Sequence, residues 1–171
     1  MSIRKPFHLK NWVEEHRHLL KPPVGNQQIY HDNGDYIVMV VGGPNARKDF
    51  HYNESEELFY QLEGTITLQI IEENTQKSIE IQEGEMFLLP AKIPHLPQRP
   101  ANTVGLVIER YRKIGEKDGC LWFCEHCKHK LHEEYFAMTD IVKQLPEVMH
   151  KFYSSEDLRT CKNCNSIMQK P

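Results

Sequence analysis

The sequence predicts an all-β core, folded as a β-sandwich or jelly-roll barrel, and three observations support this prediction. A series of short segments rich in β-branched, aromatic and aliphatic residues runs from Tyr36 to Tyr111. Turn-forming stretches such as "HDNGDY", "ENTQK" and "EGE" separate these segments. No helical pattern stands between them, whereas a parallel sheet would require connecting helices.

The expected strands follow one another in chain order. Tyr36–Val41 is a continuous apolar run, which indicates a buried strand, and Thr65–Glu72 alternates between apolar and polar residues. The other expected strands are Glu57–Leu62, Ser78–Ile81, Met86–Pro90 and Thr103–Tyr111. All have the length usual for strands of a small barrel.

The segments outside this series differ in character. Leu9–Leu20 predicts a short N-terminal helix, because good helix formers carry scattered apolar residues and "KPP" follows. The stretch from Gly115 to Lys130 is loop-like and rich in metal-binding residues. We therefore divide the chain into a barrel with its N-terminal helix, residues 1–114, and a small C-terminal extension, residues 115–171.

The C-terminal extension contains one further helical pattern, Met138–Ser155. Thr139 or Asp140 would cap this helix at its start. Pro146 would break or restart it, because proline cannot donate a backbone hydrogen bond.

The composition is that of an ordinary globular protein of 171 residues, 39% hydrophobic and 26% charged. A net charge of −3 with both signs interspersed argues against nucleic acid as a partner. The N-terminus has no apolar core of signal-peptide length, and no window approaches the roughly 20 apolar residues of a membrane span. A cytoplasmic protein without membrane contact is expected, in which five cysteines suit metal binding better than disulfides.

Two stretches contain candidate ligands for a catalytic metal. "RKDFHYNESEELFYQLEG" carries His51 and Glu57, and "EMFLLPAKIPHLPQR" carries His95. Taken singly, each histidine reads as a surface or hydrogen-bonded residue and the glutamate as a solvated charge. Together, two histidines and one carboxylate converging from different strands suit Fe(II) and leave positions open for substrate and O2.

The glycines and the proline around these residues resemble the two cupin motifs. The first motif, a glycine, a His-x-His pair, a glutamate and a glycine, is matched by Gly43, His51, Glu57 and Gly64. The second motif, a glycine, a proline and a histidine five residues after the proline, is matched by Gly84, Pro90 and His95. The chain departs from these motifs at three positions: Asn53 replaces the second histidine, Lys92 a glycine and Arg99 an asparagine.

These departures resemble one branch of the cupins, the 3-hydroxyanthranilate 3,4-dioxygenases. The resemblance rests on "VGGPNARKDFHYNESEELFYQLEG", "EMFLLPAKIPHLPQRP", "TVGLVIER" and "LLKPPVGNQ", and it extends over nearly the whole chain. It implies a cupin jelly-roll barrel in which His51, Glu57 and His95 hold Fe(II). It also implies cleavage of 3-hydroxyanthranilate by O2 to 2-amino-3-carboxymuconate semialdehyde, the precursor of quinolinate in tryptophan (kynurenine) degradation and NAD synthesis.

The substrate implied by the resemblance is an aromatic ring with a carboxylate and adjacent amino and hydroxyl groups. Arg47 and Arg99 each lie four residues from a predicted metal ligand, so both can face one cavity and bind the carboxylate. Glu109 matches the family's "VxER" glutamate and is expected to accept the hydroxyl proton. Glu57 is expected to contact the substrate as well as the metal.

The extension carries a second candidate metal site, made by two Cys-x-x-Cys turns. Such a pair of turns suits one tetrahedral thiolate site, filled by zinc or a single iron. The ligands would be Cys124, Cys127, Cys161 and Cys164. This site has no open position, so a structural role is expected, and microbial members of the resembled family carry a rubredoxin-like site here. Cys120 is left over, although its spacing to Cys124 keeps it in contention.

Other functions stay open on sequence grounds. A cupin could catalyse isomerisation or a different oxygenation, although Arg47, Arg99 and Glu109 favour a carboxylated substrate. A zinc-ribbon module that binds nucleic acid or protein would need a basic or aromatic surface around the cysteines, which this acidic chain does not offer clearly. The resemblance and the exposed strand edges also predict a homodimer.

Overall fold

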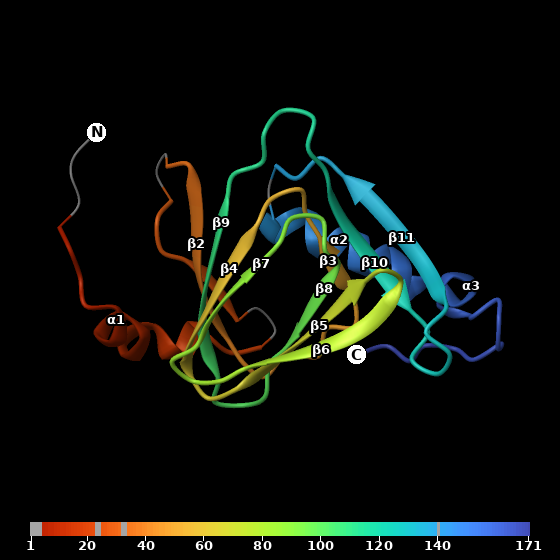
Figure 1. Ribbon diagram of the computed structural model, residues 1–171, viewed down its shortest axis with the longest axis horizontal. Coiled ribbons are helices and arrows are strands. Elements are labelled where there is room, and N and C mark those ends of the chain that lie inside the picture. The colour runs from red at the N-terminus through yellow and green to blue at the C-terminus, as the bar shows by residue number, and fades with distance from the viewer. Residues whose placement is uncertain (1–4, 23–24, 32–33, 140) are drawn as a thin grey trace.

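The computed structural model describes residues 5–22, 25–31, 34–139 and 141–171, and its centre consists of two β-sheets (Figure 1). The strands are β1 (Asn26–Gln28), β2 (Tyr36–Gly42), β3 (Phe50–Tyr52), β4 (Glu57–Glu63), β5 (Ile66–Glu72), β6 (Thr75–Ile81), β7 (Met86–Leu89), β8 (His95–Gln98), β9 (Val104–Arg110), β10 (Asp118–Phe123) and β11 (Lys130–Phe136). One sheet has the order β1-β2-β9-β4-β7 and the other the order β11-β10-β3-β8-β5-β6. The predicted all-β jelly-roll core is confirmed.

The main hydrophobic core lies between the two sheets. Every second residue of β2, β4 and β9 points inward, as at Met39, Phe59 and Val107, because side chains alternate along a strand. Leu68 and Ile70 of β5 meet them from the facing sheet. The same alternation turns Glu57 and Glu109 inward, so polar side chains replace apolar ones at one end of this interior.

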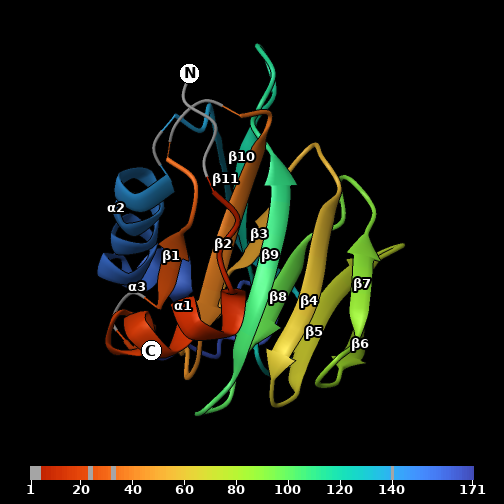
Figure 2. The ribbon, with the colours of Figure 1, turned by 90° about the vertical axis from the view of Figure 1, so that its left-hand side faces the viewer.

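The helices gather at one side of the two sheets (Figure 2). They are α1 (Leu9–His16), continued by the 3-10 turn η1 (Arg17–Leu19), α2 (Ile141–Ser154) and α3 (Glu156–Arg159). The predicted N-terminal helix is confirmed: Val13 of α1 and Leu20 pack against Val40 of β2. None of the helices in the described part of the chain has the length and hydrophobicity needed to cross a membrane.

The prediction that Pro146 breaks or restarts the second helix is wrong, because α2 runs unbroken through it. The apolar face of this helix carries Leu145 and Phe152 into a cluster with Trp122 of β10. The rings of Trp122 and Phe152 stack with their centres 4.2 Å apart. We infer that this packing outweighs the lost hydrogen bond. Asp140, one of the two residues expected to cap this helix, lies outside the described residues.

The prediction that residues 115–130 are loop-like is also wrong, because they contain β10. This strand pairs with β3, opposite His51, and with β11 on its other side. Its residues from Asp118 to Trp122 are all buried. Cys120 and Trp122 lie on the same face as His51 and pack against α2, whereas Leu121 on the other face packs against Phe50 and Leu96. A strand buried on both faces shows no alternation in sequence, which is why the pattern did not reveal it.

The division of the chain into residues 1–114 and 115–171 remains a prediction about folding units. In the structure, β10 and β11 extend the sheet that contains β3, β8, β5 and β6. The N-terminal part of the extension therefore belongs to the wall of the barrel, and α2 packs against the inward face of this part of the wall.

Candidate functional site

Three buried residues with metal-ligating side chains meet inside the barrel. His51 of β3 and His95 of β8 are register partners on adjacent strands, and Glu57 comes from the facing sheet. One ligand atom of each residue lies within 4.8 Å of those of the other two. The structure thus brings together the three predicted ligands of the catalytic metal.

The polarity of this cluster fits a bound divalent cation. Nδ1 of His95 lies 3.0 Å from the carbonyl oxygen of Ile93, so it carries the proton and leaves Nε2, 3.1 Å from the Glu57 carboxylate, as the ligand atom. Burial alone would raise the pKa of Glu57, but the neighbouring imidazoles of His95 and His51 lower it. Two imidazoles and an ionised carboxylate form the donor set that suits Fe(II).

The backbone around the cluster explains the motif glycines. Gly64 and Gly84 both have positive φ, at 65° and 86°, which glycine adopts without strain. Lys92 stands where cupins have a glycine and also has a positive φ of 67°. The left-handed turn before His95 is therefore kept although the glycine is not.

Arg99 is buried, and its guanidinium includes a nitrogen without a partner. Its Nη1 has no hydrogen-bond partner among the described residues. Burial lowers the pKa of Arg99 to about 10, so the group stays charged at neutral pH. A β-carbon on Gly105 would lie 2.8 Å from this Nη1, so the glycine keeps space open for the guanidinium. An unpaired buried cation of this kind is a binding site for an anion.

Arg47 lines, together with Arg99, an open cavity of about 460 Å³ whose lining includes none of His51, Glu57, His95 and Glu109. Its side chain is 28% exposed and forms a forked ion pair with the buried carboxylate of Asp49 through Nε and Nη2. The sequence did not indicate this pairing. It fixes the guanidinium plane and leaves Nη1 as the donor not engaged with Asp49.

Glu109 lies opposite Glu57 in the register of β9 and β4. Burial raises the pKa of Glu109, and the charge of Glu57 raises it further. Its Oε2 accepts hydrogen bonds from Nδ2 of Asn53, at 3.0 Å, and from Nη1 of Arg112, at 2.7 Å. Oε1 is thus the oxygen of Glu109 that these two donors leave open.

Two residues at this site were missed by the sequence analysis. Asp118 accepts a hydrogen bond of 2.7 Å from Nε2 of His51, and Arg112 donates from Nε to Asp118 at 2.6 Å. Arg112 lies three residues after Glu109, just past the end of a predicted strand, and this spacing could have indicated a contact between the two side chains. Asp118 had no such signal, because it stood in a stretch that we expected to be a loop.

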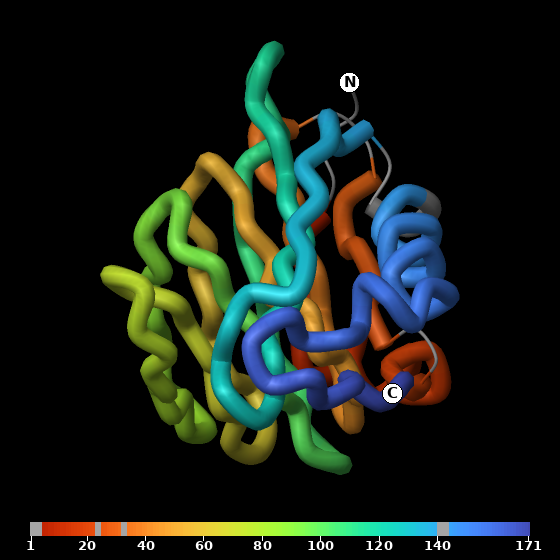
Figure 3. Tube along the Cα trace, turned by 90° about the vertical axis from the view of Figure 1, so that its right-hand side faces the viewer, coloured from red at the N-terminus to blue at the C-terminus, as the bar shows by residue number. Residues whose placement is uncertain are grey.

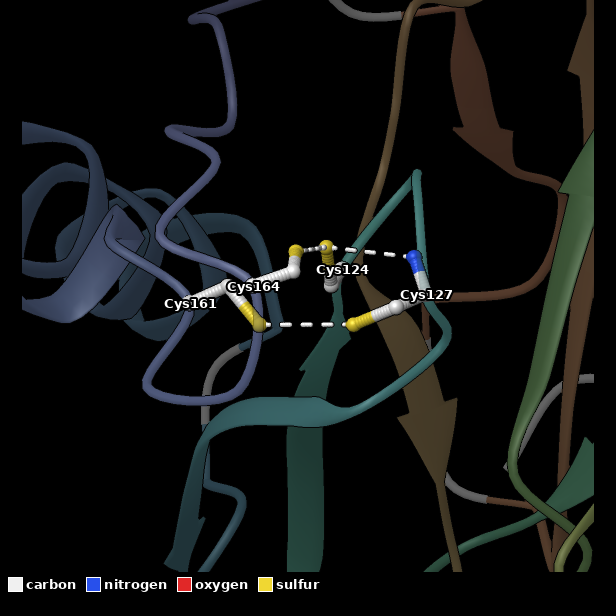
Figure 4. A group of neighbouring side chains, drawn as sticks. All are labelled: Cys124, Cys127, Cys161 and Cys164. Carbon is white, nitrogen blue, oxygen red and sulfur yellow. Dashed lines mark hydrogen bonds between the residues drawn. The ribbon is translucent and has the colours of Figure 1, made fainter.

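The four cysteines form a second cluster, with their Sγ atoms within 4.8 Å of one another (Figure 4). Sγ of Cys127 lies 3.5 Å from that of Cys161, and Sγ of Cys124 lies 3.6 Å from that of Cys164. These distances are too long for disulfides. They fit the edges of a tetrahedron, about 3.8 Å for metal–sulfur bonds of about 2.3 Å.

Two similar turns carry these cysteines and lie side by side (Figure 3). In each turn the residue four positions after the first cysteine, Lys128 or Asn165, has a positive φ and donates its N–H to the carbonyl of that cysteine. Cys120 is not in this cluster. It is buried on β10, and burial raises the pKa of its thiol to about 12.

Replacing both Cys161 and Cys164 by serine is expected to release one metal equivalent per chain and to expose α2 and α3 to proteolysis. The physical reason is that a closed thiolate site contributes folding free energy to the segment that it ties down. Metal analysis and limited proteolysis of the variant measure both effects. Turnover per iron at the His-Glu-His cluster is expected to persist, and its loss in a folded barrel would contradict a purely structural role.

A comparison with known families decides the relationship. A family model described as 3-hydroxyanthranilic acid dioxygenase matches residues 1–153. The chain belongs to the 3-hydroxyanthranilic acid dioxygenase family. A 3-hydroxyanthranilate 3,4-dioxygenase of Xanthomonas euvesicatoria pv. vesicatoria (strain 85-10) is 51% identical over 166 residues, 97% of this chain and 93% of that protein. One of Bacillus thuringiensis (strain Al Hakam) is 46% identical over 163 residues, 95% of this chain and 90% of that protein.

Among solved structures, a cupin-2 domain containing protein from Shewanella frigidimarina is similar with a TM-score of 0.48 and 20% identity, over 61% of this chain and 100% of that one. The match to the 3-hydroxyanthranilic acid dioxygenase model ends at residue 153, before Cys161 and Cys164. The second half of the cysteine cluster therefore lies outside the part of the chain that this model describes.

Proposed function

We propose that this chain is an Fe(II)-dependent dioxygenase that converts 3-hydroxyanthranilate and O2 to 2-amino-3-carboxymuconate semialdehyde, the precursor of quinolinate. The observation that carries the proposal is the buried, incompletely paired guanidinium of Arg99 near a buried His-Glu-His cluster. A carboxylated substrate would supply the missing partner. Membership of the family and the names of the relatives support the same reaction.

In this proposal His51, Glu57 and His95 hold the catalytic Fe(II), and the four thiolates hold a second iron or zinc. When bound, Fe(II) supplies positions at which the substrate's amino and hydroxyl groups and O2 come together. The protein contributes the arrangement around these positions. Because the three ligands come from the two sheets, the barrel itself sets their separation.

The two arginines bind and orient the substrate. Arg99 offers Nη1 from the interior of the barrel, and Arg47 offers the donor that Asp49 leaves open. A carboxylate between two guanidinium groups accepts strong, directional hydrogen bonds, which fix the ring in the plane required for reaction. A substrate without the carboxylate would bind with the ring poorly placed.

Glu109 accepts the proton of the substrate hydroxyl at its Oε1 atom. Its raised pKa makes it a better base than a surface glutamate, and its Oε2 is already held by Asn53 and Arg112. Because Oε2 is held in place, Oε1 keeps its direction toward the substrate hydroxyl. Glu57, directly opposite, contacts the substrate while it binds the metal.

The partners and the location follow from the same proposal. We expect a homodimer, and the exposed side chains of Met86 and Leu88 on the edge strand β7 support a contact with a second copy. Light scattering of the intact chain would decide between a monomer and a dimer. We place the enzyme in the cytoplasm, because all five cysteines are free and thiolate sites persist in a reducing compartment.

The proposal is tested by supplying the Fe(II)-loaded chain with 3-hydroxyanthranilate in air-saturated buffer. We expect loss of the substrate absorbance with uptake of one O2 per ring and formation of the semialdehyde. Two controls isolate the claim: the same mixture without O2, and 2-aminophenol, which lacks the carboxylate. An iron-loaded chain that leaves 3-hydroxyanthranilate intact would refute the proposed function.

A further inference from the structure

Arg112 and Asp118 form a buried ion pair beside the metal cluster. Arg112 follows the end of β9, and Asp118 is the first residue of β10. Their side chains are 6% and 0% exposed, although both are charged. Arg112 donates to the two oxygens of Asp118 through Nε and Nη2. Such a pair costs desolvation energy that its own attraction repays only in part, so fold stability alone is a weak reason for it.

The pair contacts one functional group on each side. Oδ2 of Asp118 accepts from Nε2 of His51 at 2.7 Å, and Nη1 of Arg112 donates to Oε2 of Glu109 at 2.7 Å. A predicted metal ligand and the proposed base are thus joined through Asp118 and Arg112. The rigid, planar guanidinium holds both carboxylates in a fixed geometry, which the compact ammonium group of lysine does not reproduce.

Asp118 contacts the cluster through His51 and is not a fourth member of the group of candidate ligands. The group of side chains whose ligand atoms all lie within 4.8 Å of one another contains His51, Glu57 and His95 but not Asp118. A carboxylate that accepts a hydrogen bond from a ligating histidine fixes the ring orientation and the nitrogen that carries the lone pair. The contact between Asp118 and His51 has this form.

The same segment contains a matched ion pair without these contacts. Arg110 forms a forked pair with Glu116, and the side chains of these residues are 28% and 17% exposed. Arg110 points away from the interior because strand residues alternate, whereas Glu109 points inward. Replacing Arg110 therefore changes the same kind of interaction in the same loop without touching the site.

We propose that Arg112 and Asp118 are positioning residues: Asp118 holds the ring of His51 for the metal, and Arg112 holds Glu109 for proton transfer. The role of Arg112 toward Glu109 rests on the proposed function, whereas the role of Asp118 toward His51 concerns metal binding alone. Neither residue contacts the substrate in this assignment. Each acts through the neighbour that it orients.

The test compares Asp118→Asn and Arg112→Lys with Arg110→Lys in the full chain. One equivalent of Zn²⁺ first fills the four-thiolate site, and Fe(II) is then titrated anaerobically by calorimetry. We expect Asp118→Asn to weaken Fe(II) binding by about 10–100-fold. At saturating Fe(II) we expect Arg112→Lys to lower kcat by about 10–100-fold with KM within about threefold, since base catalysis is weakened while carboxylate binding is retained. Arg110→Lys is expected to change neither quantity.

Thermal unfolding of each variant shows that it is folded before these values are compared. Lysine at position 112 keeps the buried positive charge, which protects the fold in a way that a neutral residue would not. The proposal is overturned if folded Asp118→Asn and Arg112→Lys proteins both bind Fe(II) and turn over like the unmodified chain. If the unmodified chain itself does not cleave 3-hydroxyanthranilate, the proposed function fails. Fe(II) affinity then still decides the role of Asp118: a loss confined to Asp118→Asn supports it, and unchanged affinity refutes it.

Discussion

Replacing His95 by alanine is expected to remove iron from the first site and to lower ring cleavage by about 10³-fold or more. Three protein ligands leave none to spare, and the several kcal/mol that a metal contributes to such a reaction correspond to a loss of this size. Metal content after anaerobic loading and O2 uptake with 3-hydroxyanthranilate measure the two effects. His95 is buried beside Glu57, so the alanine variant also leaves a carboxylate without its partner.

A second substitution separates loss of metal from loss of fold. His95→Gln places a hydrogen-bond donor next to Glu57 and fills much of the same volume, so it is expected to fold and still to lack first-site iron. The exposed His18 provides the control, because His18→Ala removes an imidazole that is not part of the cluster. Ring cleavage by an iron-free His95→Gln protein would end the assignment of this site.

Replacing Arg99 by methionine is expected to lower kcat/KM for 3-hydroxyanthranilate by about 10²–10⁴-fold. Two hydrogen bonds between charged groups contribute about 1.5–3 kcal/mol each, and 1.4 kcal/mol corresponds to a factor of ten. We expect KM to rise and kcat to fall, since the carboxylate binds the substrate and also orients its ring. Any turnover of 2-aminophenol, which has no carboxylate, is expected to change little.

The same variant is expected to be as stable as the unmodified chain or more stable. Arg99 is a buried cation with an unsatisfied Nη1, so methionine removes a desolvation cost and orphans no charged partner recorded in the described structure. Steady-state kinetics with both substrates test the expected loss of kcat/KM, and a thermal unfolding curve tests the expected stability. An Arg99→Met protein that retains its preference for the carboxylated substrate would show that another group recognises the carboxylate.

Arg47→Ala offers a useful comparison, because Arg47 already has a partner in Asp49. Its removal leaves the buried carboxylate of Asp49 unpaired, so this substitution affects stability as well as binding. The two predicted carboxylate-binding arginines are therefore not equivalent. The sequence placed both four residues from a metal ligand and could not distinguish them.

The two clusters of side chains that could hold a metal could be predicted because the information about them is local. His51, Glu57 and His95 occur at fixed offsets from Gly64, Gly84 and Pro90, and these offsets reflect turns with particular backbone angles. The alternation of strand residues also decided that Glu109 points inward and Arg110 outward. Two Cys-x-x-Cys turns similarly predicted a four-thiolate cluster before any contact between them was known.

The sequence by itself thus determined the barrel architecture and the side chains that converge in each candidate metal site, because turn angles and strand alternation depend on neighbouring residues. Only the tertiary structure decided that residues 118–123 form a strand of the barrel and that Arg112 and Asp118 join His51 to Glu109. His51 and Asp118 are 67 positions apart, and no periodic pattern records which distant strands become neighbours. That contact depends on β10 pairing with β3 and being buried on both faces, by α2 on one and by Phe50 and Leu96 on the other, which is a property of the packed chain and not of the segment.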